Sequence, residues 1–126
     1  MRTTSKLSTT TERKGKAHHQ RTPPVHPGEM LREEFLVPLR LSVNALAIAL
    51  AVPATRISEI VHGRRGISGD TALRLGEYFR TTPEFWMNLQ ARYELELARD
   101  ARIAAGARAI EPAPLGEDGA LLARTA

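Results

Sequence analysis

Small, hydroxylated and charged side chains are grouped on a short stretch of this chain: Ala54, Thr55, Arg56, Ser58 and Glu59. An arginine can donate two hydrogen bonds to O6 and N7 of guanine, and a threonine offers a hydroxyl to bases and a methyl group to thymine. A glutamate can accept from the amino group of cytosine, or hold Arg56 in position. These residue types in this pattern are suited to reading the edges of DNA bases, not to making or breaking covalent bonds.

The carboxylates Glu29, Glu33 and Glu34 are the strongest candidates for acid–base chemistry in the chain. Their spacing is that of a solvated helix face, and the sequence places no nucleophile or metal ligand beside them. There is no cysteine, and the four histidines lack ligand spacing with an acidic or thiol partner. We therefore expect no catalytic residues, no metal and no cofactor.

The small and polar side chains of residues 54–59, called here the polar group, belong to a longer stretch, LSVNALAIALAVPATRISEIVHGRRGI (41–67). The pattern of this stretch predicts two short helices joined by a tight turn. Ser42 is a good N-cap for the first helix because its hydroxyl can accept a hydrogen bond from the first turn. The apolar face of this helix is expected to consist of Ala45, Leu46, Ala49 and Leu50. Pro53 cannot continue the helix, so we expect it to end near Ala51.

A second helix is expected from Pro53 to His62, because proline is well suited to the first turn of a helix. Its inward face would carry Ile57, Ile60 and Val61, which leaves the polar group outward, and Gly63 would end it. Two helices joined in this way match the helix-turn-helix, which places its second helix in the major groove of DNA. The alternative interpretation is an ordinary helical hairpin with solvated arginines.

Residues at both ends of this unit are candidates for contacts to DNA phosphates. Arg64 and Arg65 follow the second helix in an exposed loop, and Ser42 or Asn44 lies at the start of the first. Such contacts set the register of a protein on DNA without reading its sequence. We expect a symmetric dimer to place two copies of the helix 53–62 in successive major grooves, about 34 Å apart.

Three further helices are expected around this unit, which makes the fold class all-α. The first runs from Pro27 to Val37 and is closed by Pro38, with Met30, Leu31, Phe35 and Leu36 as its apolar face. The fourth is capped by Asp70, and its buried side is expected to carry or adjoin Ala72, Leu73, Leu75, Gly76 and Phe79. The fifth, of about 18 residues, is capped by Thr81 or Thr82.

The fifth helix carries a stripe of large apolar residues: Trp86, Leu89, Tyr93 and Leu97. A helix of this length exceeds what a small five-helix core needs to cover itself, so its free apolar surface predicts a dimer contact. The alternative is that the aromatic side chains close the core of a single chain. We expect both roles to be partly fulfilled.

Composition predicts one folded domain with a tail at each end. The chain has 126 residues, 42% of them apolar, and a net charge of +4 that is concentrated in residues 1–24. We expect a disordered basic extension over 1–24, a folded domain over 25–103 and a flexible tail over 104–126. The extension is either an arm that binds DNA phosphates or a solvated tail. Without cysteines, a membrane-length apolar run or a signal-peptide core, we expect a cytoplasmic protein with no membrane partner.

Residues 41–67 resemble the helix-turn-helix of Cro/C1-type repressors. The wider run 26–99 resembles the HigA antitoxins of HigB–HigA toxin–antitoxin modules. The matching segments are HPGEMLREEFLVPL (26–39), RISEIVHGRRGIS (56–68) and DTALRLGEYFRTTPEFWMNLQARYEL (70–95). The pair Phe85-Trp86 followed by Asn88-Leu89-Gln90 is the most specific part of this resemblance.

The resemblance implies a five-helix, lambda-repressor-like domain that binds double-stranded operator DNA through its second and third helices. It also implies a homodimer that represses the promoter of its own module and binds a HigB-like toxin, in that family a ribosome-dependent mRNA endonuclease. Two positions depart from the family pattern. Ala51 stands where the turn usually has glycine, and Val43 stands where many relatives have a phosphate-contacting glutamine, a contact that is either lost or passed to Asn44.

Three functions remain open at this point. The first is an antitoxin that represses its own promoter and neutralises a toxin, which we favour. The second is a stand-alone helix-turn-helix repressor. The third is a protein-binding module that has lost DNA recognition, which the departures at Val43 and Ala51 and the neutral charge balance of residues 25–104 motivate.

Overall fold

The fold is given by a computed structural model that describes residues 22–122 of the chain. The expected disordered extension falls mostly on residues 1–21 and lies outside the described residues. The helices are α2 (Pro27–Leu31), η3 (Arg32–Leu36), α3 (Val37–Leu39), α4 (Val43–Leu50), α5 (Ala54–Val61), α6 (Gly69–Phe79) and α7 (Pro83–Ala104). Since α2, η3 and α3 follow one another without a break, they form the expected first helix. For residues 22–122, the predicted all-α class with five helices is confirmed.

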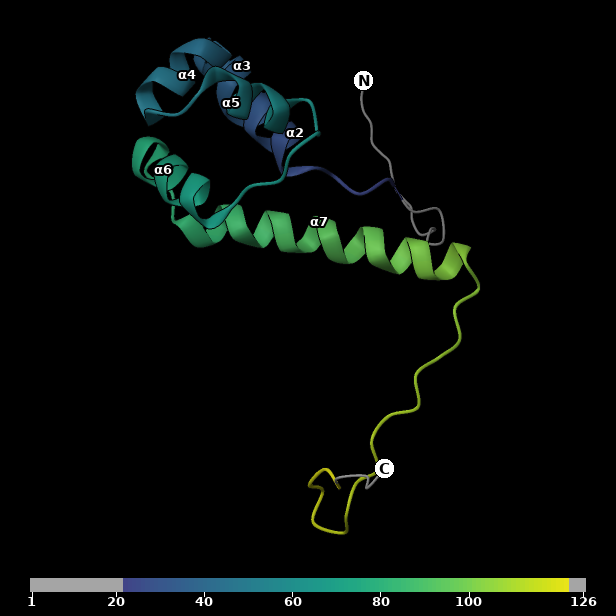
Figure 1. The fold of residues 1–126 in the computed structure, drawn as a ribbon. Helices are drawn as coiled ribbons and strands as arrows, with labels where there is room; N and C mark the ends of the chain where they lie inside the picture. Colours follow the sequence, from purple (N-terminus) through teal and green to yellow (C-terminus); the bar gives the residue numbers. More distant parts are fainter. Residues whose placement is uncertain (1–21, 123–126) are drawn as a thin grey trace, which may run out of the picture.

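The helices α2 to α6 form a bundle that packs against the N-terminal part of α7, and the rest of α7 projects beyond the bundle (Figure 1). The buried apolar core consists of Leu31, Leu36, Leu46, Ala47, Leu50, Ile57, Ile60, Ile67, Ala72, Leu75 and Trp86. Along α7, the last buried residue is Gln90. The longer part of this helix therefore extends past the core of the single chain.

The first helix continues through Pro38 and ends at Leu39, so the expectation that Pro38 closes it is wrong. The turn before the proline is a π-helix, in which the N–H of Val37 donates to the carbonyl of Arg32, five residues earlier. Proline has a φ compatible with a helix, and its main conflict is with the carbonyl four residues before it. Because the wider π turn has already shifted the hydrogen-bonding pattern, the helix accommodates the ring for one more turn.

The apolar face of α4 differs from the expected one. Its buried residues are Leu46, Ala47 and Leu50, whereas Ala45 and Ala49 are exposed. Nearly every residue of this helix is apolar, so its hydrophobic pattern does not single out one face, and the packing of α5 decides it. On α6, Leu73 is likewise 54% exposed instead of facing the core.

The turn between α4 and α5 has the left-handed conformation that glycine usually supplies, although an alanine occupies it. Ala51 has φ 59° and ψ 45°. Its N–H donates to the carbonyl of Ile48 at 3.1 Å, and the N–H of Val52 donates to the carbonyl of Ala47 at 3.0 Å. These two bonds satisfy carbonyls at the end of α4 and fix the direction in which the chain leaves it.

Side-chain caps set where α4 and α7 begin. The hydroxyl of Ser42 accepts from the N–H of Ala45 at 3.0 Å, as predicted. For the long helix, Thr82 is the capping residue, since its hydroxyl accepts from the N–H of Phe85 at 3.1 Å. The choice between Thr81 and Thr82 is thereby decided. The helix then extends over 22 residues, somewhat longer than expected.

Asp70 does not cap α6, which corrects the prediction. The cap is Ser68, two residues earlier, whose hydroxyl accepts from the N–H of Thr71 at 3.3 Å, and the helix begins at Gly69. Serine and aspartate are both favoured N-cap residues, so the local sequence leaves the choice open. In the folded chain two arginines, Arg56 and Arg74, lie beside the carboxylate of Asp70 and hold it as a partner.

Beyond α7 the chain turns at Gly106 and continues, without a further helix, into a small loop closed by the pairing of Leu115 with Leu121. Figure 1 shows this segment running away from the bundle. Its flexibility stays a prediction. Among the residues that the structure describes, no helix combines the length and the apolar character needed to cross a membrane.

Candidate nucleic-acid interface

The polar start of α5 lies at the surface because the opposite face of the helix is fixed in the core. Ile57 and Ile60 are fully buried, whereas Ala54 and Thr55 are exposed and Arg56 is half-buried. α5 packs against α4 on one side and α2 on the other. The helix itself starts at Ala54, so the proline before it is the N-cap residue and not part of the first turn. The predicted helix-turn-helix geometry is confirmed.

Arg56 is held by a carboxylate from the next helix. Its Nη1 atom donates to Oδ2 of Asp70 at 3.1 Å, and Nε of Arg74 donates to the same oxygen at 3.0 Å. The hydrogen bond from Arg74, followed by that from Arg56, lowers the pKa of Asp70 below its ordinary value. Arg74 is one of the arginines that the sequence places after the turn, whereas Asp70 was expected only as a helix cap. Its contact with Arg56 could not be predicted, because a contact between α5 and α6 has no signature in the spacing of residues.

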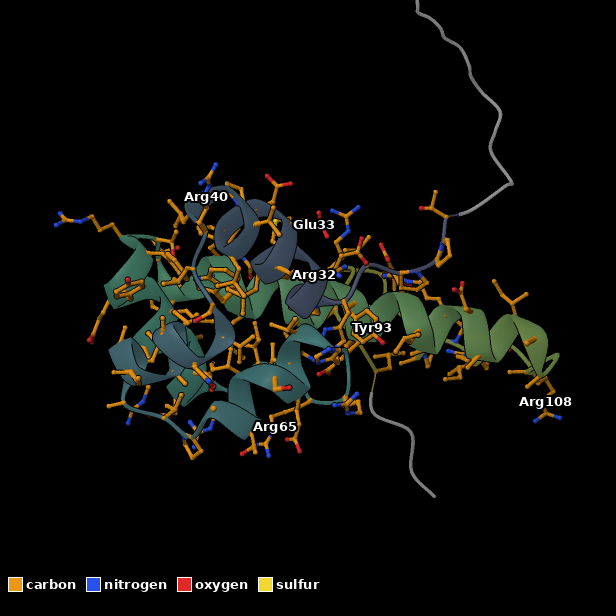
Figure 2. The ribbon with its side chains drawn as sticks, turned by 90° about the horizontal axis from the view of Figure 1, so that it is seen from above. Arg32, Glu33, Arg40, Arg65, Tyr93 and Arg108 are labelled. Atoms are coloured by element: carbon orange, nitrogen blue, oxygen red, sulfur yellow. The ribbon has the colours of Figure 1, made fainter. Side chains whose placement is uncertain are left out.

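Glu59 pairs with Arg65 and not with Arg56. Nε of Arg65 donates to Oε1 of Glu59 at 2.7 Å, so the suggestion that Glu59 orients Arg56 is not supported. Figure 2 shows Arg65 at the surface of the molecule beside α5. An exposed ion pair of this kind is weak and exchanges readily with water. Arg65 therefore remains accessible to a stronger partner such as a phosphate.

The remaining polar residues of α5 and its following loop are also at the surface. Ser58 is half-buried and bonded through its backbone carbonyl to the ring of His62, with 2.7 Å between the carbonyl oxygen and Nδ1. Arg64 is exposed in the loop after the helix. These residues continue the polar face from the first turn of α5 into the loop.

The start of α4 offers a second polar edge. The oxygen of Ser42 is engaged as the helix cap, while its hydroxyl hydrogen can still be donated. Asn44 is exposed, and Val43 is half-buried against the core. Of the residues at this helix start, Val43 is therefore a packing residue, whereas Ser42 and Asn44 are exposed.

Two contacts from outside the helix-turn-helix fix its position. Gly28 on α2 lies so close to the carbonyl of Ile60 that a Cβ atom would overlap it. The amide of Gln90, buried on α7, accepts from the N–H of Ile67 at 2.7 Å and donates to Glu94. The buried Gln90 side chain thus fastens the loop after α5 to α7, a contact that its place in the Asn88-Leu89-Gln90 motif does not indicate.

His26 connects three parts of the bundle. Its Nδ1 atom accepts from the N–H of Gly28 at 2.9 Å and caps α2, and its ring meets Tyr93 of α7 edge to face at 4.8 Å. Burial lowers the pKa of His26 from its ordinary value of 6.5, against a backbone hydrogen bond with Arg65 that raises it. The capping bond requires Nδ1 to be unprotonated, so the neutral ring is the form that supports the fold.

The apolar stripe of α7 divides into a buried and an exposed part. Trp86 is fully buried, and its indole N–H donates to the hydroxyl of Thr81 at 2.8 Å. It is therefore a core residue and is not available to a second chain. Leu89 and Tyr93 are half-buried, and Leu97 is 43% exposed. In Figure 2, Tyr93 lies where the bundle ends along α7.

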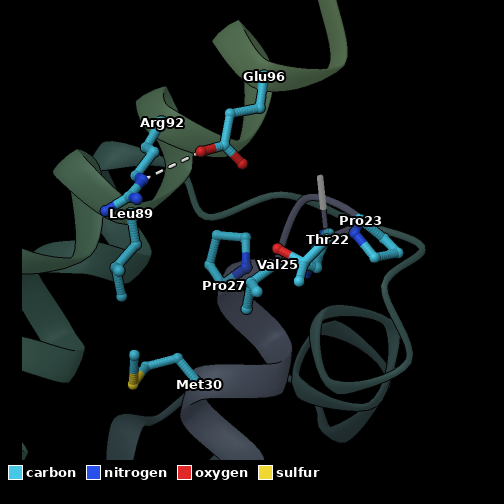
Figure 3. A pocket seen from close by; sticks show the side chains of 9 residues that line it. Thr22, Pro23, Val25, Pro27, Met30, Leu89, Arg92 and Glu96 are labelled. Atoms are coloured by element: carbon cyan, nitrogen blue, oxygen red, sulfur yellow. Dashed lines mark hydrogen bonds and ion pairs between the residues drawn. The ribbon is translucent and has the colours of Figure 1, made fainter. Parts of the chain in front are cut away.

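A hollow of about 260 Å³ separates the segment before α2 from α7 (Figure 3). Its apolar walls include Val25, Met30 and Leu89. At its rim Arg92 and Glu96 form an ion pair of 3.1 Å with each other. The two charged side chains at this rim are thus paired with each other.

No protein-family model matches the chain. The chain is, however, similar to several solved structures and curated proteins. The Pseudomonas aeruginosa antitoxin HigA, solved with the higBA promoter, is 50% identical with a TM-score of 0.67, covering 71% of this chain and 97% of that one. An addiction module antidote protein of a HigA family from Coxiella burnetii is 43% identical with a TM-score of 0.67, covering 72% and 99%. The chain belongs to the HigA family of antitoxins.

Virulence-associated protein I of Dichelobacter nodosus is 54% identical over 76 residues, which are 60% of this chain and 70% of that protein. The solved HigA chains are matched over almost their whole length, so this chain contains a complete HigA fold together with additional residues. The similar proteins are described as antitoxins, an antidote and a virulence-associated protein, and not as enzymes.

Proposed function

We propose that this HigA-family protein is the antitoxin of a type II toxin–antitoxin module, and that it binds its own operator DNA as a homodimer and represses transcription. The observation that carries this proposal is the first turn of α5, where Thr55 and Arg56 stand at the surface of a helix whose other face is locked in the core. The similarity to a HigA protein solved with a promoter supports the same conclusion.

In this proposal α5 enters the major groove, with Thr55 and Arg56 against base edges. Ala54 allows close approach, and Ser58 and Glu59 lie one turn further along the helix. The phosphate contacts come from Arg64, Arg65, Ser42 and Asn44 at the two ends of the unit.

The dimer is proposed to form through the projecting part of α7. Leu97 is 43% exposed, and Tyr93 and Leu89, one and two turns earlier on the same face, complete the contact where the helix leaves the bundle. A second copy that covered this surface would bury apolar area that one chain leaves in water. Two α5 helices about 34 Å apart would then match successive major grooves.

Gel-shift titrations test the DNA interface, with a duplex from the region upstream of the gene and a scrambled duplex of equal length. Arg56→Ala is expected to weaken the binding free energy on the upstream duplex by about 1–3 kcal/mol and to reduce the ratio of upstream to scrambled affinity. Arg65→Ala is expected to weaken binding to both duplexes by the same factor, because a phosphate contact carries no sequence information. Equal losses for the two variants on both duplexes would contradict the assignment of Arg56 to the bases.

The proposed toxin is a HigB-like, ribosome-dependent mRNA endonuclease encoded beside this gene. Co-expression of the adjacent gene with and without this protein tests that assignment. Growth rescue together with co-purification of the two proteins would support it. A neighbouring product without toxicity would instead identify a stand-alone repressor of the same fold.

A further inference from the structure

Asp70 joins the start of α5 to the turn that positions it. Its Oδ2 atom lies 3.1 Å from Nη1 of Arg56 and 3.0 Å from Nε of Arg74. Nη1 of Arg74 in turn donates to the carbonyl of Leu50 at 2.8 Å, at the end of α4. Through Arg56 and Arg74, the carboxylate of Asp70 on α6 therefore links α5 to the turn between α4 and α5.

This contact restricts the direction of the Arg56 side chain. A guanidinium reads guanine by presenting two N–H groups in one plane, and a free arginine loses rotamer freedom when it does so. In the structure Asp70 engages the Nη1 group of Arg56. The carboxylate bond thus selects a side-chain direction before DNA arrives, while the guanidinium retains N–H groups for a base.

The same carboxylate opposes attraction between Arg56 and phosphates. Binding to DNA of any sequence depends on the number of phosphates that basic side chains neutralise. Asp70 lies 3.1 Å from Arg56 and also pairs with Arg74, so its single negative charge offsets only part of the charge of the two arginines and reduces the attraction of Arg56 for phosphates. The negative side chain therefore has opposite effects on the two kinds of DNA, favouring a correctly placed guanine and disfavouring random sequence.

We propose that Asp70 is a specificity-determining positioning residue, which orients Arg56 for a two-pronged contact with a guanine and lowers the affinity of the protein for unrelated DNA. This inference rests on the proposed DNA-binding function. The competing explanation is that Asp70 only braces Arg74 against the end of α4. In that case its loss would act through stability and would not depend on Arg56.

The test compares Asp70→Asn with Glu77→Gln, a matched control that removes the same charge from an exposed position two turns further along α6. Both are titrated on the upstream and scrambled duplexes over a range of salt concentrations. Arg56→Ala and the double variant D70N/R56A complete a double-mutant cycle with D70N and the wild type. Thermal unfolding is recorded for each protein.

For D70N we expect the ratio of upstream to scrambled affinity to fall about tenfold, at the lower end of what one bidentate pair discriminates. Binding to scrambled DNA should tighten, and its salt slope should steepen by about 0.9, because Arg56 is released to a phosphate. E77Q should change the affinity for the upstream and the scrambled duplex by the same factor. In the R56A background, D70N should alter the ratio by no more than about twofold.

An equal effect of D70N on both duplexes, or the same effect with and without Arg56, would overturn the inference. If D70N does not fold, Asp70→Glu serves in its place, because it keeps the charge and displaces the carboxylate by one methylene group. An unchanged affinity ratio for D70E would then overturn the inference. A wild-type protein with no preference for the upstream duplex would contradict the proposed function itself, which is a different result.

Discussion

Replacing Ala51 by glycine should stabilise this protein, although it removes a side chain. Ala51 has φ 59° and ψ 45°, a conformation that costs an L-residue roughly 1–2 kcal/mol. Glycine avoids that cost but gives the unfolded chain more freedom, which offsets about 0.4–1 kcal/mol of the gain. Because Ala51 is exposed, no packing is lost. We expect the free energy of unfolding to rise by about 0.5–1 kcal/mol.

The matched control is Ala49→Gly, two residues earlier. Ala49 is also exposed, but it lies inside α4 with helical geometry. Glycine there should lower the free energy of unfolding by about 0.5–1 kcal/mol, since it adds freedom to the unfolded chain and relieves no strain. The same substitution is therefore expected to have opposite signs at the two positions.

Urea unfolding of the three proteins, followed by circular dichroism, measures both differences under identical conditions. The comparison needs similar m-values, so that a shifted midpoint reports stability. If A51G were destabilised to the same extent as A49G, strain at the left-handed turn would be ruled out as a significant energetic term. The reasoning that links the φ angle of Ala51 to stability would then be wrong.

Three further predictions concern contacts within the bundle. Gly28→Ala should lower the free energy of unfolding by roughly 3 kcal/mol in a urea titration, because the new Cβ would overlap the carbonyl of Ile60. Gln90→Met should cost about 1–3 kcal/mol and speed amide exchange at Ile67, whose buried N–H loses its acceptor. The pKa of His26 is lowered by burial, so its contribution to stability is complete above its ordinary value of 6.5 and is lost as pH falls toward the folded pKa. His26→Asn, which can still cap α2, should reduce the fall in Tm between about pH 7.5 and pH 5.5.

Each of these predictions has a contradicting result. A Gly28→Ala protein as stable as the wild type would mean that α2 and α5 can separate without cost. Unchanged exchange at Ile67 in Gln90→Met would mean that another group satisfies its N–H. An equal fall in Tm for His26→Asn and the wild type would assign the pH dependence to other groups.

The start of α4 and the break between α4 and α5 are predictable from the sequence. Ser42 is a capping residue by its chemistry, and Pro53 marks the entry to α5, because a proline at a helix start restricts the backbone locally. For α7 the chemistry leaves Thr81 and Thr82 as equal candidates, and the structure selects Thr82. Pro53 predicts that α4 ends before it, whereas a left-handed residue at Ala51 was expected only from the resemblance to repressors whose turn usually has glycine there. These signals act within a few residues of one another, so they do not depend on the rest of the fold.

Other features could not be predicted in this way. Pro38 looks like the end of a helix, and the π turn that carries the helix past it has no distinct local pattern. The face of α4 was misassigned at Ala45 and Ala49, because an almost uniformly apolar helix has no clear periodicity. Asp70 has the chemistry of an N-cap, and the nearby arginines give it another role.

The sequence by itself determined that a helix starts at or next to Pro53 and presents Thr55 and Arg56 outward, since prolines and apolar spacing act over one or two turns. Only the tertiary structure decided what holds that surface in place. Asp70 meets Arg56 from 14 residues away, and Gln90 meets the N–H of Ile67 from 23 residues away. Such contacts depend on how the helices cross, and helix crossing is set by the packing of the whole core.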